Sequence, residues 1–104
     1  MFAISYKFAL STPTPENEKK FAECWKGVTQ FFQNNAGALG SRLHKGEDGA
    51  FYAYAEWPDK ATFEASQQVL PTEDFVKTRL VWAEICEPSE ILWAGEVVAD
   101  LLKS

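Results

Sequence analysis

Large apolar side chains alternate with small or polar ones at the start of this chain, as they do in a β-strand. The spacing of two predicts a strand over the first ten residues with a single bulky face. Its large residues are Phe2, Ile4, Tyr6, Phe8 and Leu10. A similar alternation returns over 39–45 and 50–57, with Glu47-Asp48-Gly49 between the two runs. Glycine allows a positive φ in a tight turn, so these residues predict a β-hairpin with a three-residue loop.

The hairpin has two chemically different faces, because successive side chains of a strand point to opposite sides. One face is apolar and holds Leu39, Leu43, Phe51, Ala53, Ala55 and Trp57. The other is aromatic and polar and holds Arg42, His44, Tyr52, Tyr54 and Glu56.

Apolar residues at helical spacing predict a long helix after the first strand. Thr14 is suited to cap it and Pro15 to occupy its first position, since proline lacks the N–H that would remain unpaired there. The helix is expected to run to about Asn35, with Gly37 as its stop. Its apolar stripe consists of Phe21, Trp25, Val28 and Phe32, widened by Cys24 and Phe31.

Two shorter helices are expected after the hairpin. Asp59 caps the first, in which Phe63 is the apolar anchor. The second begins near Thr72 and ends before Pro88. Its expected inward residues are Phe75, Val76, Leu80, Ala83 and Cys86.

The last strand is predicted over Ser89 to about Ala99, and both of its faces are largely apolar. One face groups Ile91, Trp93 and Val97, and the other Leu92, Ala94, Glu96 and Val98. The order of elements is βαββαβ, which predicts a ferredoxin-like α+β domain with helices on one face of an antiparallel sheet. The bare face must then carry the surplus aromatic residues. Two copies stacked sheet on sheet, about 10 Å apart, would cover it, so we expect a homodimer.

Composition limits the class of protein. A chain of 104 residues with 46% hydrophobic and 14% aromatic residues is expected to fold as one domain over 1–104. A net charge of -5 with scattered Lys and Arg argues against nucleic acid or an anionic membrane as partner. No apolar run is long enough to span a membrane. Cys24 and Cys86 lack a redox or metal spacing, so we expect unpaired thiols in a cytoplasmic protein.

The stretch GSRLHKGEDGAFYAYAEWPDKATFEA resembles the centre of the antibiotic biosynthesis monooxygenase superfamily. Members of that superfamily are dimeric α+β barrels whose third strand typically ends in a Trp followed by a helix-capping residue. Trp57 and Asp59 occupy those places. The resemblance implies a dimeric α+β barrel formed from ferredoxin-like halves.

The chemistry of the superfamily carries over only in part. Quinone-forming members pair the strand-ending Trp with an Asn four residues earlier, where this chain has Ala53. Haem-degrading members use an Asn on the first strand, a Trp in the helix after the third strand, and a His in the following helix as iron ligand. The matching positions here hold Tyr6 or Lys7, then Ser66 and Arg79. The resemblance therefore implies no haem ligand, and we expect neither cofactor nor metal.

The candidate catalytic residues are Trp57, His44 and Arg79, and the candidate substrate-binding residues are Tyr52, Tyr54, Trp25, Phe63 and Trp82. Each has an ordinary alternative. A strand-ending Trp is often core, a lone His on a polar face is usually solvated, and an Arg on a helix is often exposed. The two tyrosines are alternatively donors of hydrogen bonds across a dimer interface.

Two hypotheses remain open at this level. The first is a cofactor-independent oxygenase acting on a small aromatic or quinol-like molecule held between sheet and helices. The second is a non-catalytic dimeric protein of the same fold that binds small molecules or acts in stress. The first requires a cavity that is lined by Trp57 and has a polar group directed into it.

Overall fold

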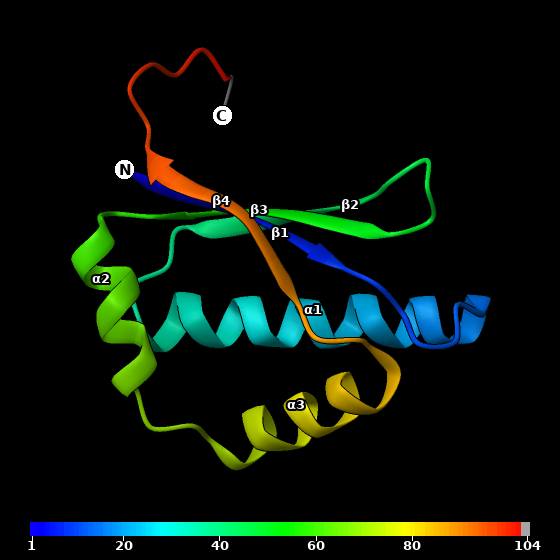
Figure 1. Ribbon diagram of the computed structural model, residues 1–104. Helices are drawn as coiled ribbons and strands as arrows, with labels where there is room; N and C mark the ends of the chain where they lie inside the picture. The colour runs from blue at the N-terminus through cyan, green and yellow to red at the C-terminus, as the bar shows by residue number, and fades with distance from the viewer. Residues whose placement is uncertain (103–104) are drawn as a thin grey trace.

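A computed structural model of the chain describes residues 1–102 and shows the expected order of elements (Figure 1). The bounds are β1 Phe2–Phe8, α1 Pro15–Asn35, β2 Gly40–Lys45, β3 Phe51–Trp57, α2 Lys60–Ala65, the 3-10 turn η1 Ser66–Gln68, α3 Glu73–Ile85 and β4 Glu90–Glu96. All strand pairs are antiparallel, in the sheet order β2-β3-β1-β4. The prediction of a ferredoxin-like βαββαβ topology is confirmed.

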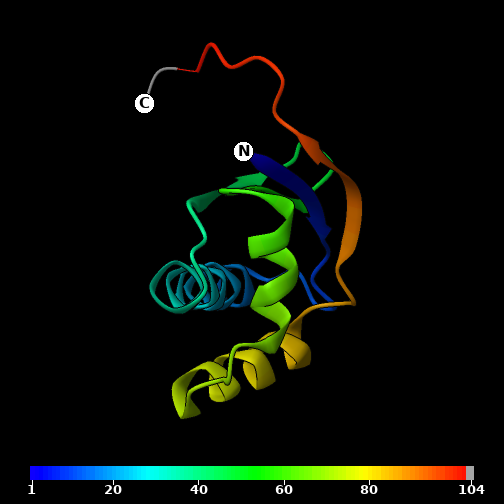
Figure 2. The ribbon, with the colours of Figure 1, turned by 90° about the vertical axis from the view of Figure 1, so that its left-hand side faces the viewer.

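The helices lie on one side of the sheet and leave the other side bare (Figures 1 and 2). In both views α3 lies farther from the sheet than α1 does, and α3 packs against α1. α2 follows β3 and lies at one side of the molecule, between the level of the sheet and that of α3. None of the helices within residues 1–102 has the length and apolar character needed to cross a membrane.

Local hydrogen bonds begin each helix where the sequence predicts. The Thr14 hydroxyl accepts a hydrogen bond from the Asn17 N–H at 3.1 Å, and the Asp59 carboxylate accepts one from the Thr62 N–H at 2.7 Å. These two caps are confirmed. Thr72 caps α3 in the same way, through the N–H of Phe75.

The predicted three-residue hairpin loop is also confirmed. The Gly46 N–H donates to the Ala50 carbonyl oxygen at 2.7 Å, which leaves residues 47–49 as the loop. Gly49 has a φ of 86°, a backbone conformation that glycine adopts without strain.

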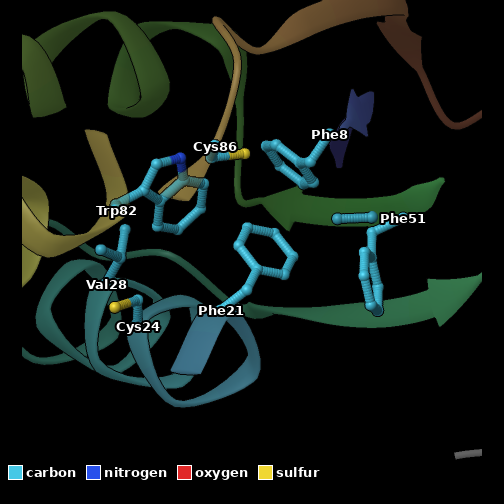
Figure 3. Packing of buried hydrophobic residues seen from close by; sticks show 8 residues of the cluster. Phe8, Phe21, Cys24, Val28, Phe51, Trp82 and Cys86 are labelled. Carbon is cyan, nitrogen blue, oxygen red and sulfur yellow. The ribbon is translucent and has the colours of Figure 1, made fainter. Parts of the chain in front are cut away.

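The centre of the main core is Phe21, whose side chain is fully buried. Its ring lies 5.4 Å from that of Phe8, 5.0 Å from Phe51 and 5.1 Å from Trp82, measured between ring centroids. Figure 3 shows these rings meeting from strand, helix and hairpin. Cys24 and Cys86 belong to the same cluster as buried free thiols, as predicted. Burial raises the pKa of both thiols.

The predicted inward face of α3 is wrong in part. Val76 and Leu80 are 44% and 61% exposed, and Ala83 is exposed as well. Trp82 is buried instead. Because α3 packs on α1 and stands away from the sheet, a narrower stripe of this helix is covered than its apolar content suggests.

The predicted faces of the last strand also need correction. A β-bulge shifts the register, so that Ile91 lies opposite Tyr6 while Trp93 lies opposite Ser5. Ile91 and Trp93 therefore point to opposite faces, because one inserted residue reverses the alternation. β4 ends at Glu96, three residues before the predicted end. Leu39 is 51% exposed and precedes β2, so it does not join the apolar face of the hairpin.

Replacing Phe21 by alanine should strongly destabilise the fold. The lost aromatic burial and the cavity left behind should lower the free energy of unfolding by about 3–5 kcal/mol. Leu80→Ala, an exposed position on α3, should change it by less than about 0.5 kcal/mol. Urea unfolding of the two variants tests this, and a similar loss in both would contradict the assigned core.

Candidate functional site

A cavity of about 500 Å³ lies between the sheet and the helices. Its sheet wall comes from the inward faces of β1 and β3, and its other walls come from α1, α2, η1 and α3. The buried core is divided into two clusters, one around Phe21 and Trp82 and the other around Trp57. Side chains of both clusters line the cavity. Its volume is in the range of small-molecule sites in proteins.

Small side chains on the sheet leave room for this cavity. Ala53 and Ala55 face it from β3, opposite Tyr6 and Ile4 of β1. On α1 the residues of the stripe predicted from the sequence differ in how far they are buried. Phe21, Cys24 and Val28 are buried, whereas Trp25 and Phe32 are only partly buried because their rings border the open space.

Aromatic rings make up much of the wall. Trp57 packs edge-on against Phe63 of α2 at 5.5 Å and against Phe32 of α1 at 5.9 Å. Phe75 of α3 lies 4.1 Å from Phe31 and 5.7 Å from Phe32. Because the rings are held by one another, the wall is an arrangement of fixed aromatic surfaces.

The polar groups at the cavity are mostly hydroxyls, amides and indoles. Ser66 is 4% exposed, donates to the Phe63 carbonyl oxygen and accepts from the Gln67 side-chain amide at 3.3 Å. The Tyr6 phenol also lines the cavity, and burial raises its pKa, so it stays protonated at neutral pH. The other hydroxyls belong to Thr29, Ser41 and Ser89.

The indole N–H groups of Trp57 and Trp82 are donors without a protein partner. No side-chain hydrogen bond within residues 1–102 involves either ring, although the residues are only 5% and 8% exposed. Within the same residues, every fully buried side-chain nitrogen or oxygen has a partner. These two nitrogens are therefore not fully buried, and both side chains contribute to the wall of the cavity.

The polar part of this lining carries one positive charge. Arg79 is its one charged side chain in the described part of the protein; it is exposed, and its guanidinium lies 5.5 Å from the centre of the Trp82 ring. Such a lining suits a ligand that carries carbonyl or anionic oxygens. Within residues 1–102 no group of three or more His, Cys, Asp or Glu residues is placed to hold a metal ion.

The structure separates the predicted site residues into two groups. Five of them line the cavity, namely Trp25, Trp57, Phe63, Arg79 and Trp82. His44, Tyr52 and Tyr54 lie on the opposite face of the sheet. A single site therefore does not combine Trp57 with His44. A role for these three residues in a site stays a prediction.

The three residues on the bare face have local partners. His44 Nδ1 lies 3.4 Å from the Tyr52 carbonyl oxygen. The Tyr52 hydroxyl donates to Asp48 at 2.6 Å, which raises the pKa of the phenol and lowers that of the carboxyl. The Tyr54 hydroxyl donates to Glu56 at 3.4 Å.

Sequence reasoning did not assign Ser66, Gln67, Thr29 and Ser41 to the site. Thr29 lies four residues after Trp25 on α1, so helical spacing alone places it on the same face. Ser41 lies between Leu39 and Leu43, so the alternation of the hairpin could have placed it on the inward face. Ser66 and Gln67 follow α2, where no periodic signal marks the side that faces inward.

No protein-family model matches the sequence, and no curated protein matches it. Solved structures do match over nearly the full length. SnoaB, a cofactor-independent oxygenase from Streptomyces nogalater, superposes with a TM-score of 0.71 at 15% identity, covering 98% of this chain and 97% of that one. The chain has the fold of this oxygenase. The predicted resemblance is confirmed at the level of the fold.

Two further structures agree with this result. An antibiotic biosynthesis monooxygenase matches with a TM-score of 0.64 at 18% identity, over 95% of this chain and 100% of that one. PA3566 from Pseudomonas aeruginosa matches with a TM-score of 0.65 at 18% identity, over 94% of each chain.

Filling the cavity from the sheet should abolish binding of small aromatic molecules. In Ala55→Leu the added carbons occupy space beside Ser41, so the affinity for menadione should fall at least about tenfold. Ala61→Leu makes the same change at an exposed position of α2 and should leave the affinity unchanged. Quenching of tryptophan fluorescence measures both, and equal affinities would contradict the site.

Proposed function

We propose that this protein is a cofactor-independent monooxygenase acting on a small, electron-rich aromatic or quinol-like compound. The observation that carries the proposal is the cavity of about 500 Å³ whose wall includes Trp57, a residue whose indole N–H has no protein partner within residues 1–102. The oxygenase hypothesis requires such a space with a polar group directed into it, whereas a fully packed core would have none. The fold shared with SnoaB, described as a cofactor-independent oxygenase, supports the same choice.

The proposed reaction takes its electrons from the substrate. A phenolate attacks O₂ through the ring carbon para to its oxygen, a carbon–oxygen bond forms, and loss of water leaves a quinone. The substrate loses four electrons in total, and they reduce O₂ to the new carbonyl oxygen and one water molecule. A substrate that ionises readily is needed, because the neutral phenol is a much weaker electron donor.

The protein would supply an aromatic cavity and donors for the phenolate oxygen. In this proposal the Trp57 N–H stabilises the anion, and the positive charge of Arg79, whose side chain is exposed at the edge of the cavity, favours ionisation of a bound phenol. Neither carboxylate nor imidazole lines the cavity within residues 1–102, so the proton would leave through water or a hydroxyl. In this proposal the substrate binds largely as its anion.

The alternative is a non-catalytic dimeric protein of the same fold that binds a small molecule. One observation favours it. Position 53, where the resemblance expects an Asn that helps to activate oxygen, holds an alanine whose side chain lines the cavity. Both hypotheses predict ligand binding, so oxygen consumption is the property that distinguishes them.

On metal-free protein, oxygen uptake should exceed uncatalysed autoxidation with a panel of 1-naphthols that carry hydrogen at the carbon para to the hydroxyl, the carbon to which the proposed reaction adds oxygen. Trp57→Phe keeps an aromatic ring but removes the N–H, and should lower kcat by about tenfold to a hundredfold. Trp93→Phe is the matched control, because Trp93 is the one tryptophan that lies outside the cavity lining. Uptake no faster than autoxidation across the panel would reject the oxygenase and favour the binding protein.

We further propose that two copies pair through the bare face of the sheet. Trp93 is 51% exposed on that face and lies 6.1 Å from the ring of Tyr54. Leu92, the residue inserted at the bulge next to Trp93, is 43% exposed, whereas Ile91 lies opposite Tyr6 on the helix side of the sheet. A cluster of large apolar side chains in water favours association.

Light scattering should give a mass of twice 11.7 kDa for the wild-type chain over a range of concentrations. Trp93→Glu places a charge in the proposed interface and should shift the mass toward the monomer. Leu80→Glu introduces the same charge at an exposed apolar position of α3 and should leave the dimer intact. A wild-type monomer at every concentration would reject the pairing.

A further inference from the structure

The charged side chains of the bare face of the sheet have no ion-pair partner within the chain. They belong to Lys7, Arg42, Glu56 and Glu90. The five ion pairs found within residues 1–102 all lie elsewhere. These charges are therefore free to interact with whatever covers the face.

Residues that lie opposite one another on neighbouring strands form three rows across this face. The first row is His44, Tyr52, Lys7 and Glu90. The second row is Arg42, Tyr54, Ser5 and Trp93. The third row is Gly40, Glu56, Ala3 and Gly95.

The two edges of the bare face differ in chemistry. β2, at one edge of the sheet, presents Arg42 and His44, whereas β4, at the other edge, presents Glu90 and Trp93. A guanidinium stacks on the face of an indole ring, and a carboxylate accepts a hydrogen bond from an imidazole. Each edge is thus complementary to the other edge and not to itself.

Two identical sheets that stack face to face can be related in two ways. Their strands stay within about 30° of each other, so the two-fold axis runs either roughly along the strands or roughly across them. An axis along the strands places β2 of one copy over β4 of its partner and keeps the rows in register. An axis across the strands places every strand over its own counterpart and reverses the order of the rows.

We propose that two copies pair about an axis along the strands, with Arg42 against the partner's Trp93 and His44 against the partner's Glu90. The two-fold axis repeats each contact, so the dimer contains both of them twice. Trp93 is 51% exposed in the single chain, which leaves its ring accessible to the guanidinium. This orientation rests on the proposed pairing of two copies and is independent of the oxygenase reaction.

The other orientation brings like groups together. With the axis across the strands, the second row lies over itself, so Arg42 faces the partner's Arg42. Like charges placed directly opposite each other destabilise a contact, the more so where water is partly excluded. Glu90 would lie over the partner's Gly95 and would gain no cation. The charges of the bare face therefore favour the axis along the strands.

Cross-linking through introduced cysteines distinguishes the two orientations. Chains with His44→Cys are mixed with mass-tagged chains with Glu90→Cys and treated with a short bis-maleimide. We expect a cross-linked heterodimer from the mixture and none from either variant alone. Arg42→Cys alone should not cross-link, whereas the axis across the strands predicts that it does. The native thiols Cys24 and Cys86 are buried, and the wild-type chain shows their contribution.

Failure of the orientation and failure of the pairing would look different. A cross-link formed by Arg42→Cys alone would overturn the orientation. So would the absence of a cross-link from the mixture when light scattering shows a dimer. A wild-type mass of 11.7 kDa at every concentration would overturn the pairing, and the orientation with it.

The effect of Arg42 on dimer affinity has opposite signs in the two orientations. Arg42→Ala should weaken the dimer at least about fivefold, because the indole ring of each copy loses a cation. With the axis across the strands, the same change would remove a repulsion and tighten the dimer. Arg42 is exposed in the single chain, so its replacement leaves the fold intact.

The matched control is Lys26→Ala, which removes a positive charge from an exposed position of α1. It should leave the dissociation constant of the dimer within about twofold of the wild-type value. Sedimentation equilibrium measures both variants. A dimer of Arg42→Ala that is as tight as the wild type, or tighter, would overturn the proposal.

Discussion

The edge contacts of Trp82 with Phe8 and Phe21 connect α3 to the core next to the sheet, whereas Phe75 connects the same helix to α1. α3 lies beyond α1, so its backbone stays away from the sheet, and a large side chain must cross the gap. Trp82 does so, which makes it the last member of the core around Phe21. Since one side of its ring closes the core, the other side is left as a wall of the cavity between the sheet and the helices. This cavity thus follows from how α3 is attached.

The parts of the fold that the sequence predicts correctly are those determined by residues that are close together in the sequence. Thr14 and Asp59 bond an N–H three residues ahead, and the loop at Gly49 closes within the hairpin. The errors concern distant partners. The exposure of Leu80 depends on how far α3 stands from the sheet, and the faces of β4 depend on a bulge fixed by pairing with β1. Neither the exposure of Leu80 nor the faces of β4 can be predicted from the apolar residues of these segments alone.

The sequence predicts some features of the candidate site and not others, for the same reason. Strand alternation already placed Trp57 and His44 on opposite faces of the hairpin, and the structure agrees. The resemblance pointed to Trp57 and Arg79, two of the residues that border the cavity. The cavity itself was harder to predict, because it depends on side chains that are absent. Ala53 and Ala55 are as compatible with a tightly packed core as with an open one, until the positions of the helices are known.

The proposed roles of Trp57 and Arg79 concern the same charge. In the proposed reaction the oxygen next to Trp57 would change from a phenolate to a neutral quinone carbonyl, and its hydrogen bond would weaken as the product forms. The positive charge of Arg79 would likewise favour the phenolate over a neutral form of the ligand. Both contacts would therefore stabilise the ionised substrate more than the neutral product that the reaction leaves.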